Sequence, residues 1–480
     1  MIWRDKLNLC EKDTQKLKLS KMSAQDLLSK EKELKPFWNE QCRENTLKLW
    51  LPTETELVDL DLTSLNISGH KSWFWIRVNS PKSKNSQKSY SISYISSLPD
   101  CTELEITKTR LNRLYPTKEQ RKIFLKWISV SRYVYNFTVE KLRQHEGKTP
   151  NWMSYWKDVI ATKLPEFCDE VPFQIKKIAV RDAINALKEG KKRVKKGLIP
   201  KFELKFRSKK RPIQSCFIPK SAIKSSGIYP RVSDKGLRYA EPLSESLMDS
   251  RLVFRSGKFY IATPFKEKYV VAENQGQYIV SIDPGVRSFH TFYSPNVAGH
   301  IGYNDFSRIV RLGQHLDNLI FRASKASKQR KRRMMKAAGR MREKIKNLID
   351  ELHHQAARFY VDNFDVILLP KFETSQMANK VHRKIRSKTV RSLMSFAHYR
   401  FSQFLKHKAF ETGKIVIDVT EEYTSKTHPL SGELLNIGSN RRVNLGFDWI
   451  DRDILGAFNI MLKALVDSPG KFRLITVNNS

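Results

Sequence analysis

The chain has 480 residues, 40% of them hydrophobic, and a formal net charge of +39. This apolar content is enough for several cores, and the length predicts about three domains. A charge this large opposes compaction unless a polyanion neutralises it, so nucleic acid is the expected partner. The alternatives are a ribosome-associated or membrane-surface protein, and the large apolar content argues against both.

The cysteines are few and scattered. Five of them, an odd number, lie far apart and never form a C-x-x-C pair. We therefore expect no disulfide framework and a reducing compartment. The N-terminus lacks the apolar segment of a signal peptide, and no apolar run approaches the roughly 20 residues that span a bilayer. No membrane partner is expected.

Residues 1–104 differ chemically from the rest of the chain. They hold 16 Lys and Arg against 14 Asp and Glu, a net charge of +2, which leaves +37 for the other 376 residues. We interpret this segment as an appended α+β extension that contacts protein at least as much as nucleic acid.

The next segment predicts a strand followed by helices. Residues 104–111 alternate apolar and polar side chains, as in a half-buried strand. Thr117 and Gln120 have the spacing of a capping box, so a helix should begin there. Helical patterning continues over most of 116–199. It ends in a basic run that contains Lys191, Lys192 and Arg193.

Residues 200–268 predict a β-rich block with a basic outer face. Phe202, Leu204 and Phe206 alternate with charged residues, and further short strand patterns follow. The basic cluster of this block is Lys209, Lys210 and Arg211. Such clusters contact phosphate or act as nuclear import signals, and one cluster can do both.

An acid at the end of a buried strand is the most informative feature. Residues 278–283 are apolar and β-branched up to Asp283, and Pro284-Gly285 then breaks the strand. A carboxylate at an open strand tip can bind a divalent metal ion. A second acidic turn, 451–453, runs into a helix about 170 residues downstream. The sequence therefore predicts a folded metal site, as in a metal-dependent nuclease.

A long basic helical region is predicted at about 305–360. Residues 341–359 carry one apolar stripe at helical spacing, and eleven Lys and Arg against one acid lie between Lys325 and Lys346. So many like charges repel one another, which favours phosphate contact over a merely solvated face. The candidate phosphate-binding residues are Arg330, Lys331, Arg332, Arg333, Lys336 and Arg340.

The remaining pattern is that of an α/β domain. A buried strand at 365–370, a helix at about 384–411, a strand at 414–422 and the helix after Asp453 follow in order. Together with three strands near 278–301, this order predicts an RNase H-like domain over 275–480. Its first strand should be central, with the two later strands parallel beside it.

Four motifs resemble those of a known family. Tyr278-Ile-Val-Ser-Ile-Asp-Pro-Gly-Val-Arg287 resembles the first RuvC motif of TnpB and of its eukaryotic and viral relatives, the Fanzor proteins. The segment from Asp451 to Ile460 resembles the third RuvC motif, and Tyr423-Thr-Ser-Lys-Thr427 resembles the segment before the zinc ribbon. Residues 113–136 resemble the N-terminal block. The motifs keep the family's order, and an appended N-terminus is more typical of Fanzor.

The resemblance implies an RNA-guided DNA endonuclease with one RuvC site. Its partners would be a guide RNA encoded beside the gene and target double-stranded DNA next to a short recognised motif. Residues 105–115 with 200–268 would form a wedge β-barrel, 116–199 a helical recognition domain, and 275–480 the RuvC domain. The expected form is a monomeric ribonucleoprotein in the nucleus of a eukaryotic or viral host cell.

The middle acid departs from the family's pattern. The family usually ends its fourth strand with Glu, where this chain has Pro370, whereas Fanzor proteins carry the acid at the end of the next strand. That position offers Glu421, with Glu422 beside it, and Glu373 is a third candidate. Neighbouring strand tips lie about 4.8 Å apart, so an acid can move between them. Consecutive side chains face opposite ways, and Glu421 is favoured.

The zinc ribbon is degenerate. The family's four cysteine positions, in an insertion at about 424–450, align with His428, Ser431, Val443 and Gly446. One ligand of four cannot hold a structural zinc ion, so none is expected. The pair His353-His354 is interpreted as a surface pair rather than a site.

The resemblance assigns Asp283, Glu421 and Asp453 to the catalytic site. Three carboxylates favour Mg²⁺ or Mn²⁺, and two ions would bridge the scissile phosphate. Arg452 either touches phosphate or caps its turn. Three other functions stay open: a regulator with an inactive RuvC site, a protein-only junction resolvase, and a structural RNA-binding protein.

Overall fold

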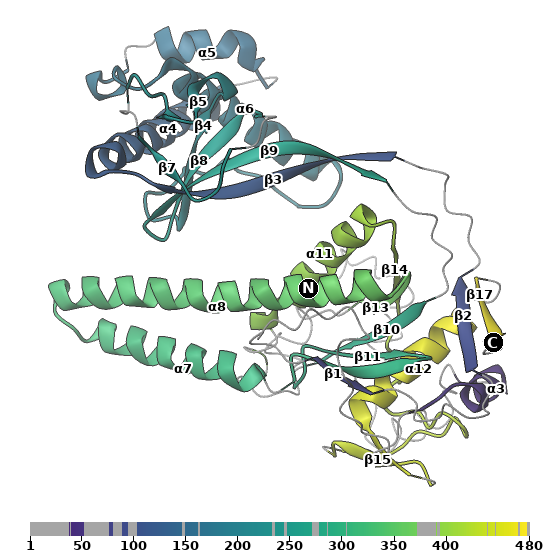
Figure 1. Cartoon of the computed structure of the whole chain (residues 1–480). Helices are drawn as coiled ribbons and strands as arrows, with labels where there is room; N and C mark the ends of the chain where they lie inside the picture. The colour runs from purple at the N-terminus through teal and green to yellow at the C-terminus, as the bar shows by residue number, and fades with distance from the viewer. Residues whose placement is uncertain are drawn as a thin grey trace, which may run out of the picture. The chain divides into compact units, whose positions relative to one another are not determined.

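The computed structural model divides the chain into two compact units, residues 1–102 with 270–480, and residues 103–269 (Figure 1). The residues that it describes are 38, 40–51, 76–79, 89–94, 103–145, 149–161, 164–232, 236–243, 247–270, 278–285, 287–303, 305–371, 390, 394–438, 440–446, 448–468 and 471–477. We describe each unit by itself.

The first unit is built on a six-stranded mixed sheet of order β1-β12-β11-β10-β13-β14. β10 (Ile279–Pro284) pairs antiparallel with β11 (His290–Ser294) and parallel with β13 (Val366–Pro370). β14 (Ile415–Val419) lies parallel to β13. The predicted central first strand and parallel later strands are confirmed. This topology brings the carboxyl ends of β10, β13 and β14 to one edge.

Helices cover both faces of this sheet (Figure 1). α12 (Arg452–Asp467) packs on one face, where Phe458 and Met461 meet Ile279 and Leu368. α8 (Lys328–Asn363) and α11 (His398–Glu411) pack on the other. Burial on both faces explains why β13 is apolar at every position and β10 at four of its six positions.

The predicted basic helical region is two helices lying side by side (Figure 1). α7 (Asp305–Ser324) ends before a short turn, and α8 begins after Ser327 at its N-cap. The start of α8 carries exposed basic side chains, whereas Ile349, Leu352 and Ala356 further along are buried in the core. The helix therefore anchors one end in the unit and presents a charged end to solvent.

The interpretation of His353-His354 as a surface pair is wrong for its first member. His353 is only 3% exposed, and one of its ring nitrogens hydrogen-bonds the Phe396 carbonyl oxygen at 2.8 Å. His354 is exposed. Because consecutive helical residues point about 100° apart, one imidazole reaches the core while its neighbour faces solvent.

The described parts of the N-terminal segment belong to the first unit. β1 (Ile76–Asn79) pairs with β12 (Val297–Ile301), and β2 (Ser89–Tyr94) pairs with β17 (Phe472–Val477). α3 (Glu40–Lys48) packs against α12. The segment thus extends the sheet that carries Asp283 rather than standing apart from it.

In the described part of the second unit, two helices pack on a five-stranded sheet and a third packs against one of them. The helices are α4 (Lys118–Gln144), α5 (Trp152–Ala161) and α6 (Phe173–Lys195), with a short η3 (Glu166–Cys168) between the last two. The predicted capping box is confirmed, since Thr117 and Gln120 satisfy each other's backbone N–H groups. Phe124 and Trp127 lie at the centre of the core.

The sheet of this unit has the order β4-β8-β9-β3-β7. These strands are β4 (Ile213–Ile218), β8 (Ser250–Arg255), β9 (Lys258–Val270), β3 (Glu103–Tyr115) and β7 (Arg238–Tyr239). A separate two-stranded sheet consists of β5 (Ile223–Lys224) and β6 (Gly227–Ile228), and it follows the short helix η4 (Lys220–Ala222). The expected joining of 105–115 to the later strands is confirmed. Closure into a barrel stays a prediction.

The strand predicted from the alternation of Phe202, Leu204 and Phe206 is wrong. This stretch has no strand pairing, and its backbone is held by a side chain instead, since the guanidinium of Arg143 donates to the Leu204 carbonyl at 2.7 Å. The Phe202 ring occupies the space beside Gly190, where a Cβ would be 2.2 Å away. Hydrogen bonds from side chains therefore take the place of strand-to-strand backbone hydrogen bonds in this stretch.

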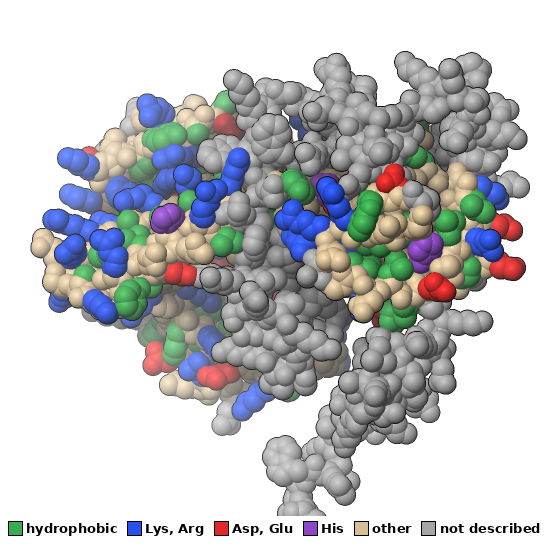
Figure 2. Space-filling view, turned by 90° about the horizontal axis from the view of Figure 1, so that it is seen from below, with side chains coloured by type: hydrophobic (Ala, Val, Ile, Leu, Met, Phe, Trp, Pro, Cys, Tyr) green, Lys and Arg blue, Asp and Glu red, His purple; other side chains and the backbone are tan. Residues whose placement is uncertain are grey.

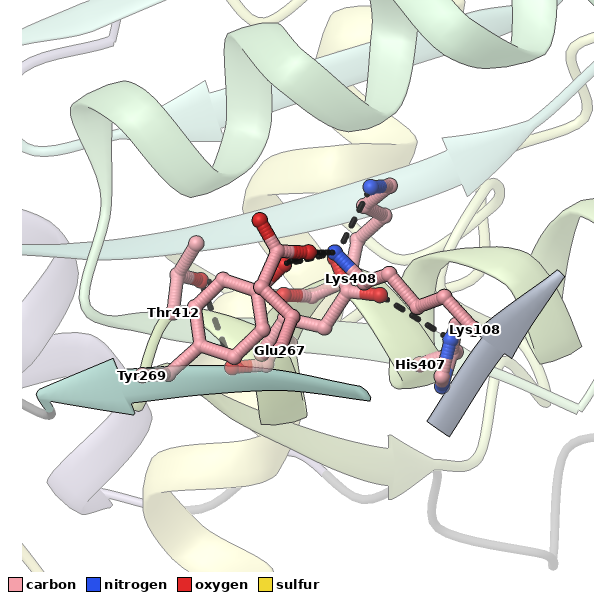
Figure 3. A network of polar contacts seen from close by, with 8 residues as sticks. Lys108, Glu267, Tyr269, His407, Lys408 and Thr412 are labelled. Carbon is pink, nitrogen blue, oxygen red and sulfur yellow. Dashed lines mark hydrogen bonds and ion pairs between the residues drawn. The ribbon is translucent and has the colours of Figure 1, made fainter. Parts of the chain in front are cut away.

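Polar contacts stabilise the ends of elements in each unit (Figure 3). In the second unit, the Lys108 ammonium pairs with Glu267 at 3.1 Å and donates to the Tyr269 hydroxyl, joining β3 to β9. In the first unit, Lys408 and His407 both pair with Glu411 in the last turn of α11, at 2.8 and 3.0 Å.

Candidate active site

Asp283 lies where β10 meets α12. A Cβ built at Gly456 would be 2.7 Å from the Asp283 Oδ2 atom, so the carboxylate lies directly against the backbone of the helix. Two residues earlier, the Ser281 hydroxyl donates to the Ala457 carbonyl at 2.6 Å. Strand and helix are therefore fastened together on the face that carries Asp283.

The N-terminus of α12 presents Asp453 to the same region. Asp451 is the N-cap, and its carboxylate accepts from the backbone N–H groups of Asp453 (2.8 Å) and Ile454 (3.3 Å). The Arg452 guanidinium contacts the Asp453 carboxylate at 3.5 Å and donates to the Gly438 carbonyl at 3.4 Å. Asp453 is thus fixed in the first turn by its two neighbours.

Glu421 follows β14 at the same sheet edge. Pro370 is level with Asp283 in the register, Val419 is the partner of Pro370, and Glu421 is two residues further on. Glu421 lies beyond the end of β14, and its charge is one of those that raise the pKa of Asp283. Glu421 is half-buried and Glu422 is exposed.

A tight turn after Glu421 is attached to α12 by one buried amide. Asn459 is fully buried, and its Nδ2 donates to the carbonyls of Thr424 (2.7 Å) and Thr427 (2.8 Å). Tyr423 takes a left-handed conformation, with φ 65, that costs a non-glycine residue roughly 1–2 kcal/mol. The segment Tyr423–Thr427 is therefore bonded to α12, and this attachment fixes the position of Glu421 relative to Asp453.

The carboxylates act on one another. Burial raises the pKa of Asp283 well above its usual value, the charges of Asp453 and then Glu421 raise it further, and Arg452 opposes them. Burial raises the pKa of Glu421 to about 7. Glu422 is not among the groups that act on Asp283.

This donor set fits a divalent cation. The oxygen ligands are those that Mg²⁺ and Mn²⁺ prefer, and a cation would relieve the repulsion that raises the pKa of Asp283. Within the described residues, no three His, Cys, Asp or Glu side chains already stand as a finished metal site. The carboxylates would therefore adjust on binding an ion.

The predicted site residues divide into two groups. Asp283, Glu421 and Asp453 are brought together, whereas Glu422 is exposed and is not among the groups that act on Asp283, and Glu373 lies outside the described residues. Sequence reasoning missed what Gly456 and Asn459 do. The spacing of Gly456 three residues after Asp453, on one face of a helix, is the signal that could have revealed its contact.

Residues 424–450, which the resemblance aligns with a zinc ribbon, contain no cysteine. β15 (Arg442–Asn444) and β16 (Trp449–Asp451) form a hairpin over a small core that includes Val443, Ile450 and Leu455. The His428 ring accepts from the Ser431 N–H at 3.1 Å and contacts the Leu445 carbonyl at 3.3 Å. Apolar packing and one imidazole take the positions of metal ligands, so these residues do not fit a zinc ion.

The predicted phosphate-binding residues are exposed in three places. Figure 2 shows Lys and Arg side chains gathered towards the far ends of α7 and α8. The exposed residues are Arg330, Lys331, Arg332, Arg333, Lys336 and Arg340 on α8, Lys191, Lys192 and Arg193 at the end of α6, and Lys209, Lys210 and Arg211 before β4. All are available to a polyanion.

The fold and site define a mixed α/β protein with acids at the carboxyl edge of its central strands, an arrangement typical of nucleases. Two family descriptions match parts of the chain. Residues 398–460 match the Cas12f1-like TNB domain, and residues 107–147 match the helix-turn-helix domain of the OrfB IS605 type.

The chain is similar to viral proteins described as TnpB-like or as putative transposases. It is 26% identical to "Putative transposase A625R" of Paramecium bursaria Chlorella virus 1, over 77% of this chain and 90% of that protein. It is 23% identical to TnpB-like protein L79 of Acanthamoeba polyphaga mimivirus, over 73% of this chain and 72% of that protein. A solved Cas12f1-sgRNA-target DNA complex matches at a TM-score of 0.46 and 12% identity. The match covers 76% of this chain and 99% of the chain in that structure.

None of the described helices combines the length and the apolar character needed to cross a membrane.

Proposed function

We propose that this protein is an RNA-guided DNA endonuclease of the Fanzor type, cutting DNA at one RuvC site. The observation that supports this most strongly is the Asp283 carboxylate seated on Gly456, with its pKa raised by Asp453 and Glu421. Three acids from distant parts of the chain converge where a phosphate-cleaving metal site would lie. The relatives' names support an association with mobile elements.

Asp283, Glu421 and Asp453 would hold Mg²⁺ or Mn²⁺. When bound, the ions would activate the attacking water and stabilise the leaving oxygen. The chain itself sets where the carboxylates stand: Asp451 fixes the first turn of α12, and Asn459 fixes the turn after Glu421. Arg452, which opposes the pKa rise of Asp283, adds a positive charge at the same place.

The basic surfaces would hold nucleic acid by its backbone. Base pairing with a guide RNA would supply sequence recognition, and the protein would read the geometry of the heteroduplex and a short adjacent motif. The exposed cluster at the start of α8 suits phosphate contact, and the charge of the chain outside its first 104 residues suits a polyanionic partner. We propose that the ribonucleoprotein acts in the nucleus of a eukaryotic or viral host cell.

A nuclease-inactive, RNA-guided DNA-binding regulator is the second candidate. Pro370 favours it, because β13 ends without the acid that the resembling family usually carries there. The position of Glu421 at the neighbouring strand tip favours cleavage instead.

The test is to express the full chain with its native flanking DNA, purify it and sequence the RNA that it retains. We expect one abundant RNA, and Mg²⁺-dependent cutting of double-stranded DNA that matches its variable end. Asp283→Asn and Glu421→Gln should abolish cutting, and Glu422→Gln is the matched control. A heterogeneous mixture of cellular RNAs would reject guided recognition, and cutting that survives Asp283→Asn would reject the site.

A further inference from the structure

A pocket of about 270 Å³ opens beside the end of β10, in the first unit. Its lining includes Pro284, Leu369 and Asp418, which lie on the sheet face opposite to α12, together with residues of α11. Pro284 directly follows Asp283, and consecutive Cα atoms are about 3.8 Å apart. Asp283 and the pocket are therefore on the two sides of one strand end.

The walls on the α11 side are aromatic. His398, Tyr399 and Phe401 line the pocket, and the Tyr399 side chain is 71% exposed. The His398 ring stacks on the Phe289 ring, with centroids 5.1 Å apart and planes 12° from parallel. Stacked rings with one exposed neighbour form a surface suited to a flat, unsaturated ligand.

The backbone at the start of α11 is strained where it forms this wall. Ala397, the N-cap of α11, has a left-handed conformation with φ 53, which is unfavourable for a residue other than glycine. His398 comes directly after it and is only 4% exposed. Such strain clusters at ligand clamps, and here it lies at the pocket.

Apart from Lys371, the groups that line the pocket carry no net charge, which suits a neutral ring. Lys406 is paired with Asp418, with 2.6 Å between Nζ and Oδ1, so these two charges cancel. Burial lowers the pKa of His398 to about 3, so its imidazole is neutral at physiological pH. Ser402 and Gln403 add a hydroxyl and an amide that can hydrogen-bond a heterocycle.

We propose that this pocket takes one unstacked nucleobase of the DNA strand whose phosphate reaches Asp283. This inference rests on the proposed nuclease function and deepens it. A DNA strand that crosses this edge of the sheet would place its phosphate backbone at Asp283. One of its bases would then turn over the end of β10 and stack on Tyr399. Stacking on an aromatic side chain repays the unstacking of that base without demanding a sequence.

The test uses the full chain with its retained RNA and a matching DNA duplex. The fluorescent base 2-aminopurine is placed in turn at each position near the cut site, and its quenching is measured. In the wild type, we expect strong quenching at one position beside the cut. An abasic nucleotide at that position should slow cleavage about five- to tenfold.

Two lining variants and one control complete the test. Ser402→Trp fills the pocket and Tyr399→Ala removes the exposed ring, so each should lose the quenching and slow cleavage about five- to tenfold. Phe410→Ala removes another exposed aromatic ring of α11, which is not among the lining residues, and should change neither readout.

The outcomes separate this inference from the proposed function. Quenching that persists in Asp283→Asn supports the pocket even if cleavage is absent in every variant. Equal quenching in the wild type and in Ser402→Trp, or quenching at no position near the cut, overturns the pocket while leaving guided cleavage intact.

Discussion

Replacing Gly456 by Ala should separate stability from catalysis. The added Cβ would be 2.7 Å from the Asp283 Oδ2 atom, whereas ordinary contacts of a Cβ begin at 3.4 Å, so the carboxylate must move by about 0.7 Å. A displacement of about 1 Å at a reacting centre costs on the order of 100-fold in rate. We expect metal-dependent cleavage to fall between about 10- and 100-fold.

The same change should leave folding nearly unaffected. Alanine is favoured over glycine inside a helix by about 0.5–1 kcal/mol, which offsets the local displacement. Gly313→Ala is the matched control, because nothing lies within 4 Å of its added Cβ. That variant should gain about 0.5–1 kcal/mol in unfolding free energy and cut at the wild-type rate.

The assays are single-turnover cleavage of matching DNA and urea unfolding. A Gly456→Ala protein that cuts as fast as the wild type would refute the placement of Asp283 against the helix. A variant that unfolds would show instead that the Asp283 carboxylate cannot move away from the added Cβ.

Four further predictions follow from the same structure. Asn459→Ala should lower the unfolding free energy by about 2 kcal/mol, because it leaves the Thr424 and Thr427 carbonyls without their buried donor; a urea midpoint equal to the wild type would contradict this. A raised carboxyl pKa penalises the folded state above that pKa, so without divalent ions Glu421→Gln should stabilise the protein at pH 8 by up to about 3 kcal/mol, with no gain near pH 4; thermal melts at both values check this. His353 has a pKa lowered to about 4, so its contribution is complete above pH 6.5 and is lost as the pH falls towards 4; His353→Gln should flatten the urea-measured stability slope in that window by about 1.4 kcal/mol per pH unit. Arg332→Ala with Arg333→Ala should reduce the salt dependence of DNA binding by about 1.8 in the log–log slope, and Arg358→Ala, an exposed residue paired with Asp362 further along α8, should not.

Local patterns predicted several elements of both units well. The strand ending at Asp283 and the capping box at Thr117 each depend on residues adjacent in the chain, and both were found where expected. Alternation predicted that only one of Glu421 and Glu422 would face the site, and Glu421 is half-buried whereas Glu422 is exposed; the assignment of Glu421 stays a prediction.

Long-range pairings could not be predicted from sequence. β1 pairs with β12 more than 200 residues away, and β2 pairs with β17 near the other end of the chain, with no local sign of either partner. His353 shows the same limit, because its burial depends on where Phe396 lies. The failed strand at Phe202–Phe206 had the right alternation and lacked a neighbour to pair with.

The pairing of β1 with β12 bears on any attempt to miniaturise this protein. Deleting the first hundred residues would expose the hydrogen-bonding groups of β12, a fully buried strand, and would leave β17 without its partner. Bare sheet edges recruit strands from other molecules, so the shortened protein would tend to self-associate. A shortened version of this protein should therefore keep β1 and β2, which complete the two sheet edges.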